Sequence, residues 1–243
     1  MKLKQLEGLL GGLDQFPNPK VELEQYPTGP HIASRMLFTA ENSFEDISNK
    51  VVADFGCGCG TLGVAAALLT LIRHVLSIDI DPESLEIASL NAEELEVDMD
   101  FIQSNVMDLR WRGSTSLEVK YGILHLLNGD IWGQVYTIFL VHTLGQIVDT
   151  VIMNPPFGTR KKGADLDFLN VALKVASQAV YSLHKSSTRE HVKRTALRDF
   201  NACNAEVLCE LRYDLPKLYK FHKKKEVDIA VDLWRFVPGK HQS

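Results

Sequence analysis

The sequence has few cysteines and no long uncharged apolar run, and both shortages exclude classes of protein. Its 4 cysteines are Cys57, Cys59, Cys203 and Cys209. Two of them lie in a glycine-rich stretch, which favours neither a disulfide scaffold nor a zinc site of paired C-x-x-C knuckles. We therefore expect a reducing compartment and no bound metal. The most apolar stretch, 131–148, is interrupted by glycine, histidine and glutamine, so we expect no membrane span.

The beginning of the sequence, MKLKQLEGLLGGLDQF, has no secretory signal pattern. It lacks the continuous apolar core and small-residue cleavage site of such a signal, and it carries acids too early for a transit peptide. We expect an intracellular protein. The chain of 243 residues, 45% of them hydrophobic, is long enough to bury a sizeable core, which favours a single domain over 1–243.

Acidic and basic residues are segregated along the chain. Residues 1–110 contain seven Lys or Arg against eighteen Asp or Glu, whereas residues 150–243 contain seventeen against ten. The basic excess gathers at 160–162, 185–194 and 217–225. One such basic run is usually a solvated surface. Three basic runs, all of them after the candidate site at 151–158 described below, favour binding to a polyanion.

Short strand-type runs alternate with helical patterns, as in the helical stretches 84–97 and 164–178. Strands are predicted at 50–57, 74–80, 98–106, 149–154 and 179–185, and a final pair at 205–215 and 228–236. This order is typical of an α/β fold with a mostly parallel seven-stranded sheet, an antiparallel edge strand and helices on both faces.

The first predicted strand runs into the turn DFGCGCG at 54–60. Gly56, Gly58 and Gly60 allow the backbone to turn sharply into a helix and to approach a ligand closely. Asp54 precedes this turn, and Asp79 ends the second strand, where an acid can bind the hydroxyls of a ribose. A tight turn without a ligand and a helix N-cap are the structural alternatives. The order of these features favours a nucleotide-like ligand.

The stretch VIMNPPFG at 151–158 ends a predicted strand with four unusual residues. The Asn154 side-chain oxygen and the Pro155 carbonyl can each accept one N–H of an aromatic amine, which is otherwise a poor nucleophile. Pro156 stiffens the turn, and Phe157 offers a ring for stacking a base. An asparagine cap and a core aromatic are the structural alternatives. We favour the catalytic interpretation, because nothing structural requires this order at a strand's carboxyl end.

Five stretches, at 23–36, 51–62, 148–159, 180–191 and 210–236, carry a family resemblance. They resemble the eukaryotic small-subunit ribosomal RNA adenine-N6 methyltransferases known as the methyltransferase-like protein five family. The resemblance covers most of the chain except about 109–147. It implies a Rossmann-like class I methyltransferase fold, S-adenosyl-L-methionine as cofactor, 18S ribosomal RNA as substrate, and a location in the nucleus, including the nucleolus, and in the cytoplasm.

The resemblance also implies roles for individual residues. Gln25 and Thr28 match positions near the methionine end of the cofactor, and Asp79 matches the ribose acid. The family usually has an acid followed by a valine at the position of Asn105-Val106, and the acid faces the adenine amino group of the cofactor. The side-chain carbonyl of Asn105 can still accept a hydrogen bond from that amino group. The full set of expected cofactor-binding residues is Gln25, Thr28, Asp54, Gly56, Gly58, Cys59, Gly60, Thr61, Asp79, Asn105 and Val106.

RNA and a protein subunit are the expected partners. The residues expected to contact RNA are Lys185, Arg189, Lys223, Lys224 and Lys225. His184 and His191 are weaker candidates for binding RNA phosphate. The resemblance further implies a small zinc-binding activator subunit, forming a heterodimer through the apolar edge of the third strand.

Two other functions and one segment stay open. The first alternative is a protein glutamine-N5 methyltransferase, because a glutamine amide nitrogen is also a poor nucleophile and the same N-P-P-[FY] pattern serves it. The second is a catalytically impaired RNA-binding protein, which would transfer no methyl group. Residues 109–147 form an atypical insertion, because a connection of about 10 residues would suffice between the predicted strands at 98–106 and 149–154. It is interpreted either as an insertion that covers a neighbouring surface or as translated non-coding sequence, and we favour the second.

Overall fold

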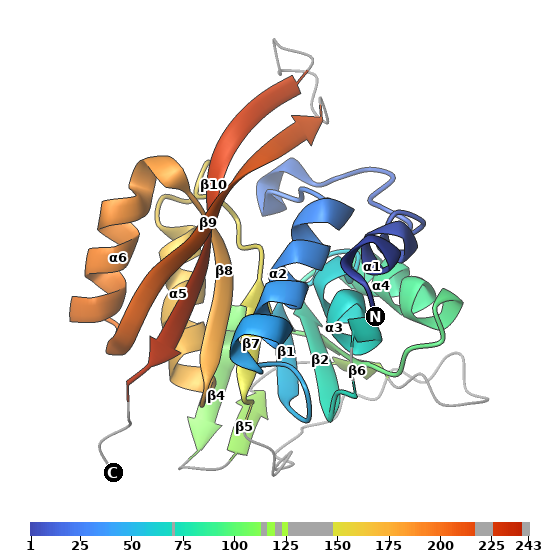
Figure 1. Cartoon of the computed structure of the whole chain (residues 1–243), viewed down its shortest axis with the longest axis horizontal. Helices are drawn as coiled ribbons and strands as arrows, with labels where there is room; N and C mark the ends of the chain where they lie inside the picture. Colours follow the sequence, from blue (N-terminus) through green and yellow to red (C-terminus); the bar gives the residue numbers. More distant parts are fainter. Residues whose placement is uncertain (70, 113–115, 120–122, 126–147, 217–225, 240–243) are drawn as a thin grey trace.

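One mixed sheet runs through the protein. The computed structural model describes the chain except residues 70, 113–115, 120–122, 126–147, 217–225 and 240–243. The strand order in the sheet is β6-β3-β2-β1-β7-β8-β10-β9, and β4 and β5 form a separate ribbon (Figure 1). The strands are β1 (Val51–Phe55), β2 (His74–Asp79), β3 (Asp100–Gln103), β4 (Leu109–Arg112), β5 (Ser116–Val119), β6 (Ile123–His125), β7 (Thr150–Met153), β8 (Ala179–Lys185), β9 (Ala202–Pro216) and β10 (Glu226–Pro238).

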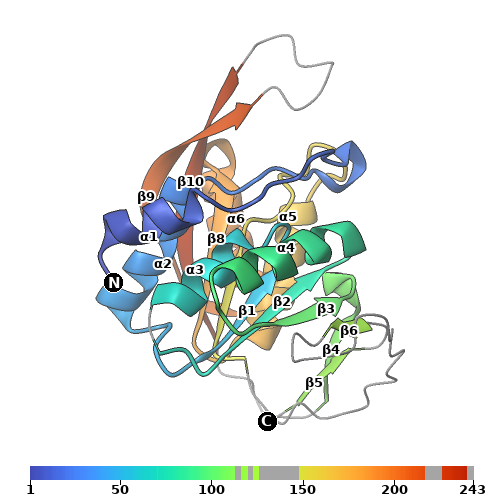
Figure 2. The ribbon, with the colours of Figure 1, turned by 90° about the vertical axis from the view of Figure 1, so that its right-hand side faces the viewer.

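Helices cover both faces of the sheet (Figures 1 and 2). Helices α1 to α4 pack into one apolar core, and α5 and α6 pack into a second core on the opposite face. No helix among the described residues is long and apolar enough to cross a bilayer. The helices are α1 (Leu3–Leu10), α2 (Pro30–Phe44), α3 (Thr61–Leu69), α4 (Pro82–Glu94), α5 (Ala164–Val175) and α6 (Arg189–Arg198), with 3-10 turns η1 (Val21–Leu23), η2 (Val106–Asp108) and η3 (Ser186–Thr188).

The central strands are parallel and buried on both faces. Every residue of β1 and β7 is buried, as the continuous apolar runs of these strands predict. Strands β3, β2, β1, β7 and β8 pair in parallel. Strand β10 then pairs antiparallel with both β8 and β9. The α/β fold with seven predicted strands is confirmed.

An eighth strand comes from the atypical insertion. Strand β6 pairs antiparallel with Phe101–Gln103 on the outer edge of β3. A segment of the chain itself therefore occupies the edge of β3 at which the partner subunit is expected to dock. Much of 109–147 lies outside the described residues, so both interpretations of this segment, an insertion or translated non-coding sequence, stay predictions. The assignment of 1–243 to a single domain also stays a prediction.

The turn between β1 and α3 packs closely against α4. Gly60 has φ +80°, and a Cβ placed on it would lie 2.9 Å from the Cβ of Ala88 in α4. Gly60 is thus needed both for its left-handed backbone and for close helix packing. Gly163, just before α5, has φ +82° but open space around it.

Substituting these two glycines distinguishes the cost of backbone strain from the cost of overpacking, because both have positive φ but only Gly60 has a close neighbour. We expect Gly163→Ala to lower the free energy of unfolding by about 1 kcal/mol, the cost of a left-handed alanine. Gly60→Ala should cost about 1–3 kcal/mol more, because it adds overpacking against α4. Denaturant unfolding of both variants measures the difference. Equal losses would contradict the packing role of Gly60.

Candidate active site

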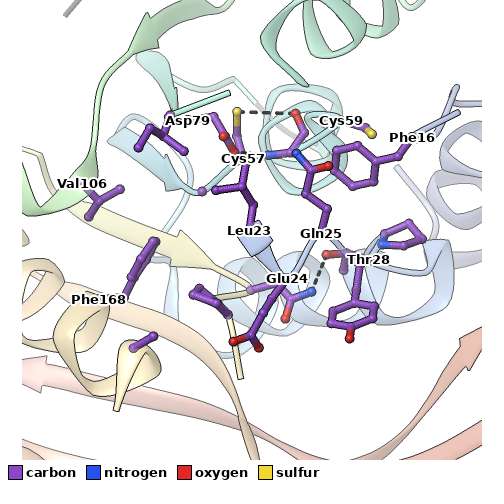
Figure 3. Close-up of a pocket in the computed structure, with 18 of the residues that line it drawn as sticks. Phe16, Leu23, Glu24, Gln25, Thr28, Cys57, Cys59, Asp79, Val106 and Phe168 are labelled. Atoms are coloured by element: carbon purple, nitrogen blue, oxygen red, sulfur yellow. Dashed lines mark hydrogen bonds between the residues drawn. The ribbon is translucent and has the colours of Figure 1, made fainter. Parts of the chain in front are cut away.

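A cavity of about 310 Å³ lies at the carboxyl ends of β1, β2, β3 and β7. Its walls include the glycine turn after β1 and the residues that directly follow β2, β3 and β7. Val106 and Phe168 lie on one side of it, and Phe16 lies on the opposite side (Figure 3). Ligands of open parallel α/β sheets bind at this edge. The strand order therefore places the cavity where the sequence patterns predict a site.

Residues 11–29, which we call the strap, close one side of the cavity, because Gln15, Phe16 and residues 22–28 belong to its wall. Asp81 holds the strap, because it accepts hydrogen bonds from Lys20 Nζ at 2.7 Å and from Gln25 Nε2 at 2.6 Å. Burial by itself would raise the pKa of Asp81, but the hydrogen bonds from Lys20 and Gln25 outweigh it and hold that pKa below its usual value. The carboxylate form of Asp81 therefore fastens the strap to the start of α4.

Asp79 links the glycine turn to the end of β2. Its Oδ2 accepts from the Gly58 amide and its Oδ1 accepts from the Asp81 amide, both at 2.9 Å. Burial raises the pKa of this carboxyl against these backbone bonds. Each carboxylate oxygen keeps a further lone-pair site, and Asp79 lines the cavity. The arrangement can accept hydrogen bonds from two adjacent hydroxyl groups.

Asp54 and Gly60 were expected to contact a cofactor, but neither is part of the cavity wall, and these two contacts stay predictions. Asp54 is only 1% exposed and accepts from the Gly63 amide at 2.8 Å. Burial raises its pKa to about 7. Asp54 thus supports the turn from beneath, while Gly60 packs on α4.

The other nine expected cofactor-binding residues line the cavity: Gln25, Thr28, Gly56, Gly58, Cys59, Thr61, Asp79, Asn105 and Val106. Asn105 differs in one respect from the expectation. Its Oδ1 accepts from the Met107 amide at 3.0 Å and so caps η2. Only the second lone pair of that oxygen is left for an adenine amino group.

The side-chain amide of Asn154 is held in one orientation. Its Nδ2 donates to Thr28 Oγ1 and to the Tyr213 hydroxyl, each at 3.0 Å. Both amide hydrogens are therefore used. Its Oδ1 is buried and has no hydrogen-bond partner among the described residues. Asn154 is part of the cavity wall, so the site contains a buried acceptor that lacks a donor, the kind of group that a ligand satisfies.

The rest of the NPPF motif is less open than expected. Pro156 lines the cavity, whereas Pro155 and Phe157 do not. Phe157 is 8% exposed, because Tyr213 packs against it edge-on at 5.7 Å between ring centroids and Lys185 Nζ lies over it at 5.9 Å. The ring is therefore largely covered in this arrangement, and its stacking on a target base stays a prediction.

Two of the predicted RNA contacts are already engaged within the protein. The Arg189 guanidinium binds the buried carboxylate of Asp232 at 2.6 Å and Glu210 at 2.8 Å. An RNA phosphate would compete with these two ion pairs, and the RNA contact of Arg189 stays a prediction. His184 is fully buried, with Nδ1 3.0 Å from Asp165 Oδ2 and Nε2 3.0 Å from Ser182 Oγ, so it is unsuited to bind phosphate. Lys223, Lys224 and Lys225 lie outside the described residues.

Several residues of the site were missed by sequence reasoning. Tyr213 comes from β9, far along the chain, and no local pattern signals its contact with Asn154. Glu24 directly precedes the predicted Gln25; its Oε1 accepts from the Arg160 amide at 2.8 Å, and its buried Oε2 has no partner in the part of the chain that the structure describes. Phe16 and Phe168 contact the glycine turn at Gly58 and Gly56.

The donors and acceptors of the cavity fit S-adenosyl-L-methionine. Glu24 Oε2 is a buried acceptor that no described residue satisfies, and it suits an ammonium group. Asp79 suits a ribose diol, and Val106 and Phe168 give an apolar surface suited to an adenine. No three His, Cys, Asp or Glu side chains gather as a metal site within the described ranges.

Comparison with known proteins agrees with this geometry. Residues 30–115 match the family model described as the methyltransferase small domain. The chain is 46% identical to the rRNA N(6)-adenosine-methyltransferase METTL5 of Danio rerio, over 98% of this chain and 100% of the relative. It is 39% identical to the Drosophila melanogaster enzyme of that name, over 98% of both chains.

A solved structure supports the same assignment. The crystal structure of a candidate RNA methyltransferase from Pyrococcus horikoshii superposes with a TM-score of 0.74 at 30% identity, over 99% of both chains. The chain therefore belongs to the METTL5 family of rRNA N(6)-adenosine-methyltransferases, which are Rossmann-like enzymes dependent on S-adenosyl-L-methionine.

Proposed function

We propose that the chain methylates N6 of an adenosine in small-subunit (18S) ribosomal RNA. The observation that carries this proposal is the buried Oδ1 of Asn154 on the cavity wall, which no hydrogen-bond donor of the described residues satisfies. The names of the relatives support ribosomal RNA as the substrate class. The target base has to leave its stack to reach such a pocket, as in other enzymes that act on a base.

Acceptors, rather than a strong base, activate the target amine. The lone pair of an adenine amino group is delocalised into the ring, so an oxygen that accepts one N–H draws the nitrogen toward tetrahedral geometry. Asn154 Oδ1 and the Pro155 carbonyl are assigned to the two N–H groups. When bound, S-adenosyl-L-methionine would supply a methyl group activated by its sulfonium. The two acceptors would hold the amine nitrogen in place while it accepts that methyl group and releases one proton to solvent.

Cofactor contacts follow from the cavity wall. We assign Asp79 to the ribose hydroxyls, Glu24 to the ammonium group, and Val106 with Asn105 to the adenine. Phe157 can still stack on the target base if Lys185 leaves its ring, and a phosphate group of bound RNA would draw the ammonium away. This makes Lys185 and Phe157 parts of one substrate contact.

The acceptor role of Asn154 is tested by its removal. We expect Asn154→Ala to lower methyl transfer by at least about 100-fold, as removing a preorganised transition-state hydrogen bond does. Cofactor affinity should stay within about tenfold, or 1.4 kcal/mol. The measurements are transfer of labelled methyl to ribosomal RNA and calorimetry with S-adenosyl-L-methionine.

A matched control is Asn42→Ala, because Asn42 is an exposed asparagine of α2 whose side chain bonds only its own helix. This variant should keep full activity. A fully active Asn154→Ala would sink the mechanism. The same assay contains a glutamine tripeptide, and methylation of the peptide without transfer to RNA would favour the glutamine-N5 alternative instead.

The basic segment between β9 and β10 is proposed to bind RNA. Lys185, the last residue of β8, pairs with Val231, so the first residues of β10 extend past the carboxyl edge of the sheet, where the cavity lies. Lys223, Lys224 and Lys225 are joined to this end of the hairpin. Their ammonium groups are suited to phosphate contacts beside the site.

Reversing these three charges to glutamate should weaken RNA binding and reduce its salt dependence. Each phosphate contact contributes a slope of about −0.7 for single strands, so three lost contacts should flatten the plot of log affinity against log salt by about 2. Reversal of Lys2, Lys4 and Lys50 gives the same change in net charge as a control. Parallel salt plots for wild type and the tail variant would eliminate this contact.

A small zinc-binding activator subunit is proposed as the protein partner, with the outer edge of β3 as its docking site. Strand β6 already pairs with that edge, so a subunit that docks there has to displace β6. Replacing residues 109–147 by a short glycine-serine linker should then strengthen binding of the subunit in a pull-down. Unchanged binding would place the interface elsewhere.

We also propose a location in the nucleolus and the cytoplasm. Small-subunit RNA is made in the first compartment and works in the second, so the proposed substrate supports both.

A further inference from the structure

Tyr213 connects three segments at the Asn154 amide. It lies in β9 and is 2% exposed. Its hydroxyl donates to the Pro27 carbonyl of the strap at 2.8 Å and accepts from Asn154 Nδ2 at 3.0 Å. Its ring packs edge-on against Phe157, at an interplanar angle of 88°. One side chain thus contacts both ends of the NPPF motif and the strap that closes the cavity.

The direction of these hydrogen bonds decides which end of the amide faces outward. A phenol has one hydrogen, and the Pro27 carbonyl is an obligatory acceptor that takes it. Burial raises the pKa of Tyr213, so that hydrogen is retained across the neutral range. Only lone pairs of the phenol oxygen are then left for Asn154, and they can bind Nδ2 but not Oδ1.

Thr28 cannot make the same selection. Its hydroxyl accepts from Asn154 Nδ2 at 3.0 Å, but a threonine hydroxyl can rotate to donate to Oδ1 if the amide flips. A flipped amide would present two N–H donors to an incoming amine, which is itself a donor. The Pro27 carbonyl, acting through the Tyr213 hydroxyl, removes that alternative.

We propose that Tyr213 is a positioning residue for methyl transfer, which keeps Asn154 Oδ1 directed at the target amine by denying the amide its flipped orientation. This inference rests on the proposed acceptor role of Asn154. It also couples the strap to the reaction, because the same segment that lines the cofactor cavity supplies the carbonyl that orients Tyr213.

The test is Tyr213→Phe, which keeps the ring against Phe157 and removes only the hydroxyl. We expect kcat to fall about tenfold, the effect of losing one oriented hydrogen bond that acts in the transition state. The KM values for S-adenosyl-L-methionine and for RNA should stay within about twofold, because Tyr213 is not itself part of the cavity wall and the strap keeps its bonds to Asp81. An unchanged kcat, or a loss confined to KM, would overturn the proposal.

Tyr181→Phe is the matched control. Tyr181 is also a fully buried tyrosine whose hydroxyl donates to a protein acceptor, Asp46 Oδ2 at 2.8 Å, but it does not contact the NPPF motif or the cavity wall. We expect this variant to melt at a lower temperature with kcat unchanged. If both variants lost kcat in proportion to melting temperature, the effect of Tyr213 would be structural and the proposal would fail.

A measurement on the wild-type protein keeps the proposal testable if Tyr213→Phe does not fold. The side-chain NH₂ signal of Asn154, assigned by its disappearance in Asn154→Ala, should exchange with water at least about tenfold more slowly than that of the exposed Asn204. Equal exchange rates would overturn the proposal. An inactive Asn154→Ala together with an unaffected Tyr213→Phe rejects only this inference, whereas an active Asn154→Ala rejects the proposed function itself.

Discussion

The orientation of the Asn154 amide is the constraint on which the site depends. An adenine amine presents hydrogens, so a useful partner has to present an oxygen that no protein donor has already satisfied. In this protein both Asn154 hydrogens are bound, and its Oδ1 is buried without a partner among the described residues. An unsatisfied buried acceptor costs about 1–3 kcal/mol, a cost that a bound substrate amine would relieve.

The fold brings three distant segments to this amide. Strand β7 ends at Met153 and presents the NPPF motif at the carboxyl edge of the sheet. The strap crosses that edge and is fastened by Asp81 to the start of α4. Strand β9 supplies Tyr213, whose partner Pro27 lies 186 residues away in the sequence. The antiparallel end of the sheet thus stabilises a site that is otherwise built from parallel strands.

Local sequence patterns predicted the elements and the polar ends of the strands, because strand burial, glycine turns and proline pairs are properties of short segments. The turn at 54–60, Asp79 and Asn154 were all placed by such patterns. What these patterns missed required knowledge of partners that only the fold supplies. In the sequence Arg189 looks like an unpaired cation, whereas in the fold it pairs with Asp232 and Glu210. Phe157 looks like an accessible ring, whereas in the fold Tyr213 packs against it. No local pattern indicates that β6 pairs with β3.

The central claim is that this protein places N6-methyladenosine in small-subunit ribosomal RNA. Mass spectrometry of nucleosides from purified small-subunit RNA, in cells with and without the gene, tests it most directly and includes whatever partner subunit the enzyme uses. The account predicts that N6-methyladenosine falls in small-subunit RNA, that large-subunit RNA is unaffected, and that the wild-type gene restores the lost modification. An unchanged N6-methyladenosine content in the small-subunit RNA of the deletion strain would contradict it.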